Sequence, residues 1–116
     1  VGTIKNMANH TVDRGDTRRH VDAGADVVVG LGQAHLMVRR ERGDLNSALA
    51  EMEAQGMDYV VVEGFKHSDL AKIVMGEIDA PNLLRRIDLA DLNPELVREL
   101  ADTVRHMEDY SPAKVV

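Results

Sequence analysis

The chain has 116 residues, no cysteine, 3% aromatic residues and a formal net charge of −6. This length suits one domain whose core is built from Val, Leu, Ile, Met and Ala. The lack of cysteine excludes disulfides, thiolate metal sites and cysteine nucleophiles, and no apolar run approaches the roughly 20 residues of a membrane helix.

The charge is distributed unevenly along the chain. Residues 1–43 carry 7 basic and 5 acidic groups, a net +2, whereas residues 44–116 carry 7 basic and 15 acidic groups, a net −8. Nucleic-acid binding depends on Lys and Arg that neutralise phosphates, so an acidic chain is poorly suited to it. We therefore expect neither nucleic acid nor a membrane as a partner and expect a cytoplasmic protein. The N-terminal third is the better face for an anionic ligand.

The first predicted elements are a strand, a polar loop and a short helix. Val1–Lys5 reads as a strand, and residues 6–15 form a polar loop. Asp16 is expected to cap a helix over Thr17–Ala23 through its carboxylate. Gly24 then supplies the left-handed residue that ends many helices.

A β-branched run and an amphipathic helix come next. Asp26–Leu31 contains three successive valines, a pattern typical of strands buried on both faces of a parallel sheet. Ala34–Arg39 is expected to be a further strand. Asp44 is expected to cap a helix with an apolar stripe at helical spacing, which Gly56 ends.

The second half alternates strands with a long final helix. Strands are expected at Asp58–Val62 and Ala71–Met75, and Leu83–Ile87 is compatible with strand or helix. Asn93 caps the last helix and Pro94 occupies its first position. Its predicted apolar face is Leu96, Val97, Leu100, Val104 and Met107. The alternation predicts an α/β layered fold with a mainly parallel sheet, as a single domain over 1–116.

The strongest local signal for chemistry is the stretch from Tyr59 to His67. A hydrophobic strand ends there in Glu63 and Gly64. Ligands of α/β sheets lie at the carboxyl ends of the strands, and a carboxylate at this place can hold a Mg²⁺-bound water. The alternative reading is an acid that faces solvent where the strand ends, because short motifs are unspecific.

A second signal is the polar loop that leaves the first strand. It offers the ammonium of Lys5, the imidazole of His10 and the carboxylates of Asp13 and Asp16. We interpret Asp16 as a helix cap and Asp13 as the freer candidate for binding. The five histidines are scattered and lack the helix-face spacing of a metalloprotease site.

Three ordered motifs resemble the MobB family. Gly2-Thr3-Ile4-Lys5 resembles the family's strand ending in Gly-x-Ile-Lys. Asp13 to Thr17, followed by Ala23-Gly24-Ala25, is similar to its Asp-x-x-Gly-Lys-Asp-Ser/Thr segment and Ala-Gly-Ala turn. Val62 to His67, followed by Ala71 to Val74, resembles its most recognisable stretch. The resemblance covers residues 1–75 in the same order.

The resemblance implies a P-loop NTPase-like fold, usually homodimeric, that binds GTP with Mg²⁺ and hydrolyses it slowly. It also implies partnership with MobA, the transferase that attaches GMP to molybdopterin. Some archaeal members are fused to a molybdopterin-synthase subunit, which makes that subunit a further candidate partner. Glu63 would be the catalytic acid and, with Asp13, would hold Mg²⁺ through water. The nucleotide-binding set would be Lys5, His10, Asp13, Thr17, Gly64 and Lys66.

The chain departs from the family pattern at its start. No G-x-x-x-x-G-K-[ST] motif occurs in it, although that loop cradles the phosphates and binds Mg²⁺ in P-loop proteins. The family's Lys-His is Lys5-Asn6 here, and only His10 remains of its paired histidines. We therefore expect that the first strand–P-loop–helix unit precedes Val1 and is missing. The chain would then be inactive alone and would bind GTP and Mg²⁺ only if that loop is supplied.

The loss of a strand would also leave sheet edges and apolar surface exposed, and unpaired edges template association. We expect a marginally folded or oligomeric chain. A monomer that unfolds cooperatively above about 60 °C would contradict this expectation.

Two other functions stay open at this point. One is a non-enzymatic adaptor of the same fold that docks MobA without nucleotide, through the loop from Lys66 to Lys72. The other is a related P-loop metallochaperone GTPase that handles a metal through His10 and His67.

Overall fold

A computed structural model describes residues 1–7 and 15–110. The chain divides into two compact units, Val1–Glu63 (unit 1) and Gly64–Val116 (unit 2). Helices and two pairs of parallel strands make this an α/β protein, which confirms the predicted fold class. The expectation of a single domain stays a prediction.

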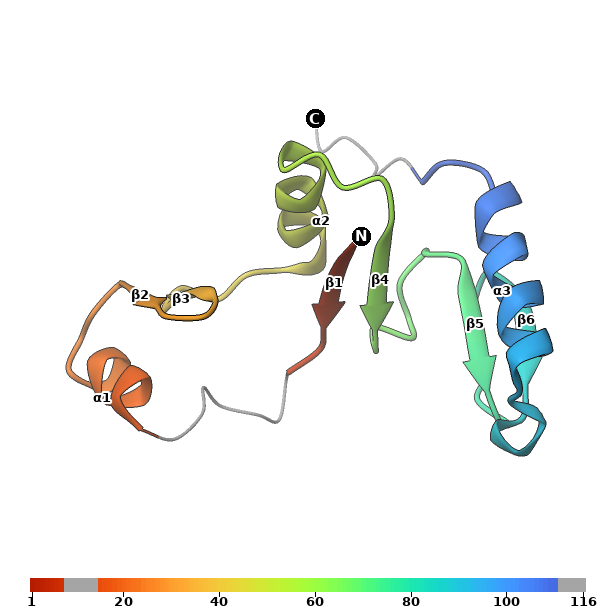
Figure 1. Cartoon of the computed structure of the whole chain (residues 1–116), viewed down its shortest axis with the longest axis horizontal. Helices are drawn as coiled ribbons and strands as arrows, with labels where there is room; N and C mark the ends of the chain where they lie inside the picture. Colours follow the sequence, from red (N-terminus) through yellow and green to blue (C-terminus); the bar gives the residue numbers. More distant parts are fainter. Residues whose placement is uncertain (8–14, 111–116) are drawn as a thin grey trace. The chain divides into compact units, whose positions relative to one another are not determined.

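Unit 1 contains a pair of parallel strands that lie side by side (Figure 1). β1 (Gly2–Lys5) pairs with β4 (Val60–Glu63) without a register shift. The buried Gly2 lies against α2 (Leu45–Ala54), since a Cβ added to it would meet the Met52 sulfur at 2.6 Å. The burial of the side chains alternates along both strands, as expected for strands with one covered face. The exposed side chains on the other face are Thr3, Lys5, Val61 and Glu63.

The two ends of α2 follow the sequence prediction. Asp44 accepts a hydrogen bond from the Ser47 amide at 2.8 Å, and the Ser47 hydroxyl accepts one from the Asp44 amide, a reciprocal capping box. At the other end Gly56 adopts a φ of 79°. The amides of Gly56 and Met57 donate back to Glu53 and Met52, the bonding pattern of a Schellman motif.

The β-branched run forms a hairpin instead of a buried parallel strand, so that prediction was wrong. β2 (Val27–Leu31) pairs antiparallel with β3 (His35–Arg39). The connection has only three residues, 32–34, which suits a hairpin and is far too short for a parallel crossover. Both strands are largely exposed, because among the described residues no element buries the face that carries Val27, Val29 and Leu31.

Helix α1 (Asp16–Asp22) precedes this hairpin and contacts β2. The expectation that Asp16 caps it was also wrong. Gly15 is the cap residue with a φ of 100°, and no side chain of the described residues caps the helix. Asp16 lies inside the first turn, where its negative charge still suits the helix dipole, and it pairs with Arg19 at 3.7 Å. Gly24 ends the helix with a φ of 104°, as predicted.

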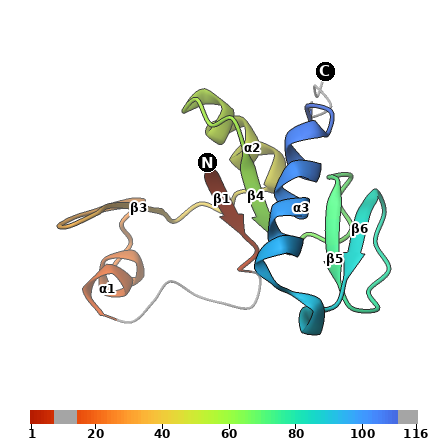
Figure 2. The same ribbon diagram turned by 45° about the vertical axis from the view of Figure 1, so that its right-hand side comes forward.

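Unit 2 is a second parallel pair with α3 alongside it (Figures 1 and 2). β5 (Lys72–Met75) pairs with β6 (Leu83–Ile87), which resolves the ambiguous segment as a strand. Val74 and Ile87 are buried between the layers. The connection 76–82 is short for a parallel crossover, and Arg86 braces it by donating to the carbonyls of Gly76 and Ile78.

After β6, a 3₁₀ turn η1 (Leu89–Asp91) leads into α3 (Pro94–His106). Of the predicted apolar face of α3, Val97 is 50% exposed, whereas the other four residues are half-buried. Arg85 of β6 ties the sheet to the helix through an ion pair with Glu99 at 3.0 Å.

Replacing the cap of α3 should lower stability measurably. The Asn93 side chain accepts a hydrogen bond from the Leu96 amide at 2.8 Å. We expect Asn93→Ala to lower the free energy of unfolding by about 1 kcal/mol, because an orphan amide loses its partner. Urea denaturation followed by circular dichroism measures this. Asn93→Asp is the matched control and should retain the midpoint, and an unchanged midpoint in the Ala variant would refute the role of the cap.

The buried core of the described residues is small. Leu49, Val74 and Ile87 are the only buried hydrophobic side chains among them, and no described polar side chain is buried. Within the described residues, no helix has the length and apolar character to cross a membrane. The small core is the feature expected of a marginal or associating chain, although the expectation itself stays a prediction.

Candidate functional site

The carboxyl ends of β1 and β4 bring together two of the predicted site residues. Lys5 and Glu63 are register partners, each the last residue of its strand. The amide of Asn6 donates to the Glu63 carbonyl at 3.0 Å and extends the pairing by one residue. Register partners in a sheet direct their side chains to the same face. An ammonium and a carboxylate therefore lie on neighbouring strands at the same edge.

Neither the Lys5 nor the Glu63 side chain forms a hydrogen bond or an ion pair with another group of the described chain. Lys5 and Glu63 are exposed and form no ion pair with each other within 4 Å. Among the described residues, no hydrogen bond reaches the Glu63 carboxylate. A carboxylate with free oxygens can accept water of a hydrated Mg²⁺, a cation that keeps several waters when proteins bind it. Glu63 thus fits the role predicted for it, and its chemistry imposes no conflict with a bound cation.

The chain turns sharply directly after Glu63. Gly64 has a φ of 87° and Phe65 a φ of 55°. Gly64 accepts this conformation without cost, but a bulky residue such as Phe65 rarely adopts it. The Ser68 amide donates to the Phe65 carbonyl at 3.0 Å and closes the turn. Strained backbone of this kind is found at functional sites, where surrounding contacts hold it in place.

Lys66 and His67 follow this turn in unit 2 and are exposed. Within the described part of the chain, neither side chain makes a hydrogen bond or an ion pair. A free ammonium on a turn of this kind is able to bind an anionic oxygen.

The other predicted residues are not brought to the β1–β4 edge by any described contact. His10 and Asp13 lie outside the described residues. Thr17 is half-buried in the first turn of α1, and no hydrogen bond among the described residues joins it to Lys5 or Glu63. The described residues also contain no group of three or more His, Asp or Glu side chains that could hold a metal ion.

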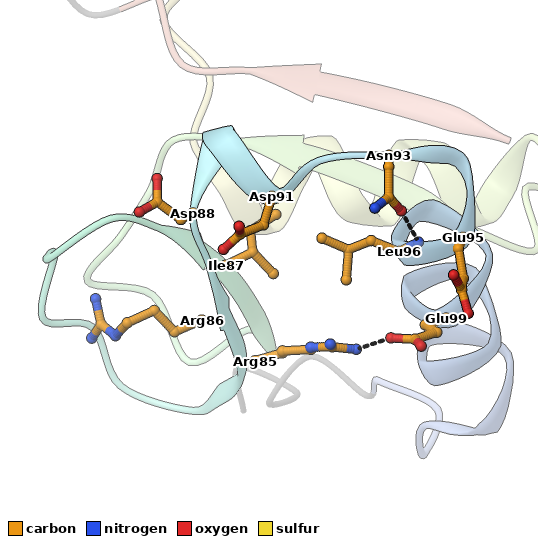
Figure 3. Close-up of a pocket in the computed structure, with 9 residues that line it drawn as sticks. All are labelled: Arg85, Arg86, Ile87, Asp88, Asp91, Asn93, Glu95, Leu96 and Glu99. Atoms are coloured by element: carbon orange, nitrogen blue, oxygen red, sulfur yellow. Dashed lines mark hydrogen bonds and ion pairs between the residues drawn. The ribbon is translucent and has the colours of Figure 1, made fainter.

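A polar cavity of about 360 Å³ lies elsewhere, within unit 2 (Figure 3). It contains none of the predicted site residues. Its two arginines are already engaged, Arg85 with Glu99 at 3.0 Å and Arg86 with backbone carbonyls. Carboxylates dominate what remains, so the cavity is unsuited to a nucleotide phosphate. It is lined by Arg85, Arg86, Ile87, Asp88, Asp91, Asn93, Glu95, Leu96 and Glu99.

Sequence reasoning missed a hydrogen-bond network around the loop that follows Phe65. The Lys72 ammonium donates to the carbonyls of Ser68, Leu70 and Pro81. The Asn82 amide group donates to the Asp69 carbonyl. A lysine next to an apolar strand gives no signal for such a role, because the partners are backbone carbonyls that any sequence has.

Tyr110 extends this network from the chain segment after α3. Its hydroxyl donates to the Asp69 carboxylate at 2.9 Å. Burial, the hydrogen bond and the charge of Asp69 together raise the pKa of Tyr110 above its usual 10.0. The folded state therefore favours the protonated phenol. The contribution of the protonated Tyr110 phenol to the stability of the fold is complete below pH 10.0. It is lost as the pH rises through the higher pKa of Tyr110 in the folded state.

We expect ultraviolet absorbance in a Tyr59→Phe background to give a phenolate midpoint for Tyr110 above 10.0. Asp69→Ala in the same background should lower the midpoint, because it removes the hydrogen bond and the charge. A midpoint at the usual value in both variants would show that the contact does not form in solution.

The chain was compared with protein families, curated proteins and solved structures. The model of a protein family described as Molybdopterin guanine dinucleotide synthesis protein B matches residues 1–89. This range includes the β1–β4 edge, the turn after Glu63 and the whole of β6. No curated protein and no solved structure matches the chain.

Proposed function

The chain belongs to the MobB family, which has a role in molybdopterin guanine dinucleotide synthesis, and from this premise we propose that it is a GTP-binding accessory protein of that reaction. It assists a MobA-type transferase, which attaches GMP to molybdopterin. The same proposal places it in the cytoplasm and gives it GTP and Mg²⁺ as ligands.

One observation carries the nucleotide part of this proposal. Lys5 and Glu63 occupy partner positions at the carboxyl edge of two parallel strands, the place where α/β sheets bind ligands. The ammonium of Lys5 suits an anionic phosphate oxygen. The carboxylate of Glu63 suits a Mg²⁺-bound water. Gly64 and Lys66 complete the proposed set along the chain, together with His10, Asp13 and Thr17.

Five of these residues have a defined task in the proposal. Glu63, with Asp13, holds Mg²⁺ through water, and the cation when bound neutralises charge on the phosphates. Glu63 also orients a water molecule near the terminal phosphate. Lys5 and Lys66 fix the phosphate oxygens, and Gly64 lets the backbone approach the ligand closely.

The printed residues contain no G-x-x-x-x-G-K-[ST] sequence. Tight GTP binding therefore needs a phosphate-binding loop in addition to them, because backbone amides of that loop supply most of the phosphate contacts. GTP and Mg²⁺ are ligands in this proposal only where that loop is present.

A homodimer is part of the proposal, with the β2–β3 hairpin as its contact surface. We define the hairpin face by the side chains on one side of the two strands, which are Val27, Val29 and Leu31 of β2 and His35, Met37 and Arg39 of β3. Arg39 at its end is already paired with Glu51 at 2.7 Å. Val29 and Met37 are register partners on it and are 48% and 54% exposed, and Val27 and Leu31 flank them at 52% and 82%. The same face of a second copy could cover these side chains in an isologous contact. Strand edges that remain unpaired favour the same association.

The proposed function is tested by reconstituting the transfer reaction. Formation of molybdopterin guanine dinucleotide by a MobA-type transferase is measured with GTP and Mg²⁺, with and without this protein carrying a phosphate-binding loop ahead of Val1. We expect the protein to increase the rate. A rate that is independent of the protein at all concentrations would refute the accessory role.

The missing loop motif favours one second candidate, an adaptor that docks the transferase without nucleotide. A pull-down of the transferase by the chain as printed separates the two. Capture that persists without GTP, combined with no GTP binding by either form, would favour the adaptor.

A further inference from the structure

The side chains of Lys72 and Asn82 hold the loop between Phe65 and Lys72 by hydrogen bonds, and we call this pair the clamp. Three consecutive loop carbonyls accept hydrogen bonds from it: those of Ser68 and Leu70 from the Lys72 ammonium, and that of Asp69 from Asn82. The Lys72 ammonium donates its third hydrogen bond to the Pro81 carbonyl at 3.0 Å. All three N–H groups of Lys72 are thereby used.

The clamp joins two segments that are distant along the chain. Lys72 is half-buried, and its own amide donates to the Asn82 carbonyl at 2.9 Å. Asn82 has a φ of 57°, a conformation that asparagine tolerates better than most residues. Tyr110 holds the same loop from a third segment through the Asp69 carboxylate. Among the described residues no carboxylate pairs with Lys72, so its charge serves only the backbone carbonyls of the loop and of Pro81.

The consequence concerns the free side chains of the loop. The clamp binds the backbone carbonyls of the loop. The side chains of Lys66 and His67 stay exposed and make no hydrogen bond within the described chain. The strained turn at Phe65 needs such external support to persist. A loop that is ordered before binding loses less entropy when a ligand arrives.

We propose that Lys72 is a positioning residue, which holds the loop after Phe65 so that Lys66 is presented to an anionic oxygen of the nucleotide. This inference rests on the proposed function. Lys72 touches no ligand in it and acts only through the loop backbone. Its hydrogen bonds are charge-assisted, so an apolar side chain of similar length cannot replace them.

The first readout measures the order of the loop in the absence of nucleotide. Residue-resolved amide exchange is measured on the chain as printed, for wild type, Lys72→Met, Lys72→Arg and Lys66→Met. The reporters are the Ser68 amide, bonded to Phe65, and the Gly76 amide, bonded to Ile87 away from the loop. We expect Lys72→Met to accelerate Ser68 exchange about tenfold or more, with Gly76 unchanged. Lys72→Arg should restore most of the protection, and Lys66→Met should leave both amides unchanged.

Fluorescent-GTP affinity, measured with Mg²⁺ in the form that carries a phosphate-binding loop, supplies the second readout. Lys66→Met and Lys72→Met should each weaken binding, with Lys72→Arg close to wild type. Unchanged Ser68 exchange in Lys72→Met would overturn the clamp. A loosened loop with unchanged affinity would overturn the positioning role. If wild type itself does not bind GTP, the proposed function fails, and the exchange data alone decide whether the clamp exists.

Discussion

We expect Glu63→Gln to lower Mg²⁺-dependent GTP hydrolysis by about ten- to a hundredfold, the usual loss when a group that holds a metal through water is altered. Glutamine keeps the size of the side chain but lacks the negative charge. The variant should therefore fold normally. The reaction is followed by phosphate release in the form of the protein that carries a phosphate-binding loop.

The matched control for this experiment is Glu53→Gln. Glu53 is an exposed acid in α2 of the same unit, and it should be neutral in hydrolysis. Both variants should give the wild-type unfolding midpoint, because an exposed carboxylate without partners contributes little to stability. Unchanged turnover in Glu63→Gln would remove Glu63 from the proposed site. Equal losses in both variants would point to a general charge effect.

A charged residue on the hairpin face should break the proposed dimer. Val29→Lys places an ammonium at the centre of the contact, where it would be buried without a partner. We expect the dimer dissociation constant to rise about thirtyfold or more. Sedimentation at several concentrations measures the change.

Leu36→Lys is the matched control for the hairpin. Leu36 lies in β3 and is 65% exposed, but its register partner is Gly30, on the side opposite Val29 and Met37. A monomeric wild type would rule out the dimer. Dissociation caused by Leu36→Lys but not by Val29→Lys would place the contact on the other face of the hairpin.

The elements with strong local signals could be predicted from the sequence. Asp44 and Gly56 bound α2, and Asn93 and Pro94 begin α3, because capping depends on neighbouring residues only. The proximity of Lys5 and Glu63 also follows from the sequence. Each residue ends a strand, and the carboxyl ends of parallel strands meet at one edge of a sheet.

Other features depend on information that local patterns lack. Three successive valines suit a pleated strand in either direction, so they could not predict the antiparallel pairing of β2. The short connection at Gly32 was the better signal. Whether Asp16 caps a helix depends on where the helix begins, and Gly15 takes that place. The Lys72 clamp requires the carbonyl of Pro81, nine residues away along the chain.

The central claim is that the β1–β4 edge serves a GTP·Mg²⁺ site, and equilibrium binding of fluorescent GTP tests it most directly. The chain as printed is compared with a form that carries a phosphate-binding loop ahead of Val1, each with and without Mg²⁺. We predict that only the loop-bearing form binds, and that removing Mg²⁺ or replacing Lys5 with Met weakens its affinity. A loop-bearing form that folds but does not bind GTP would contradict the claim.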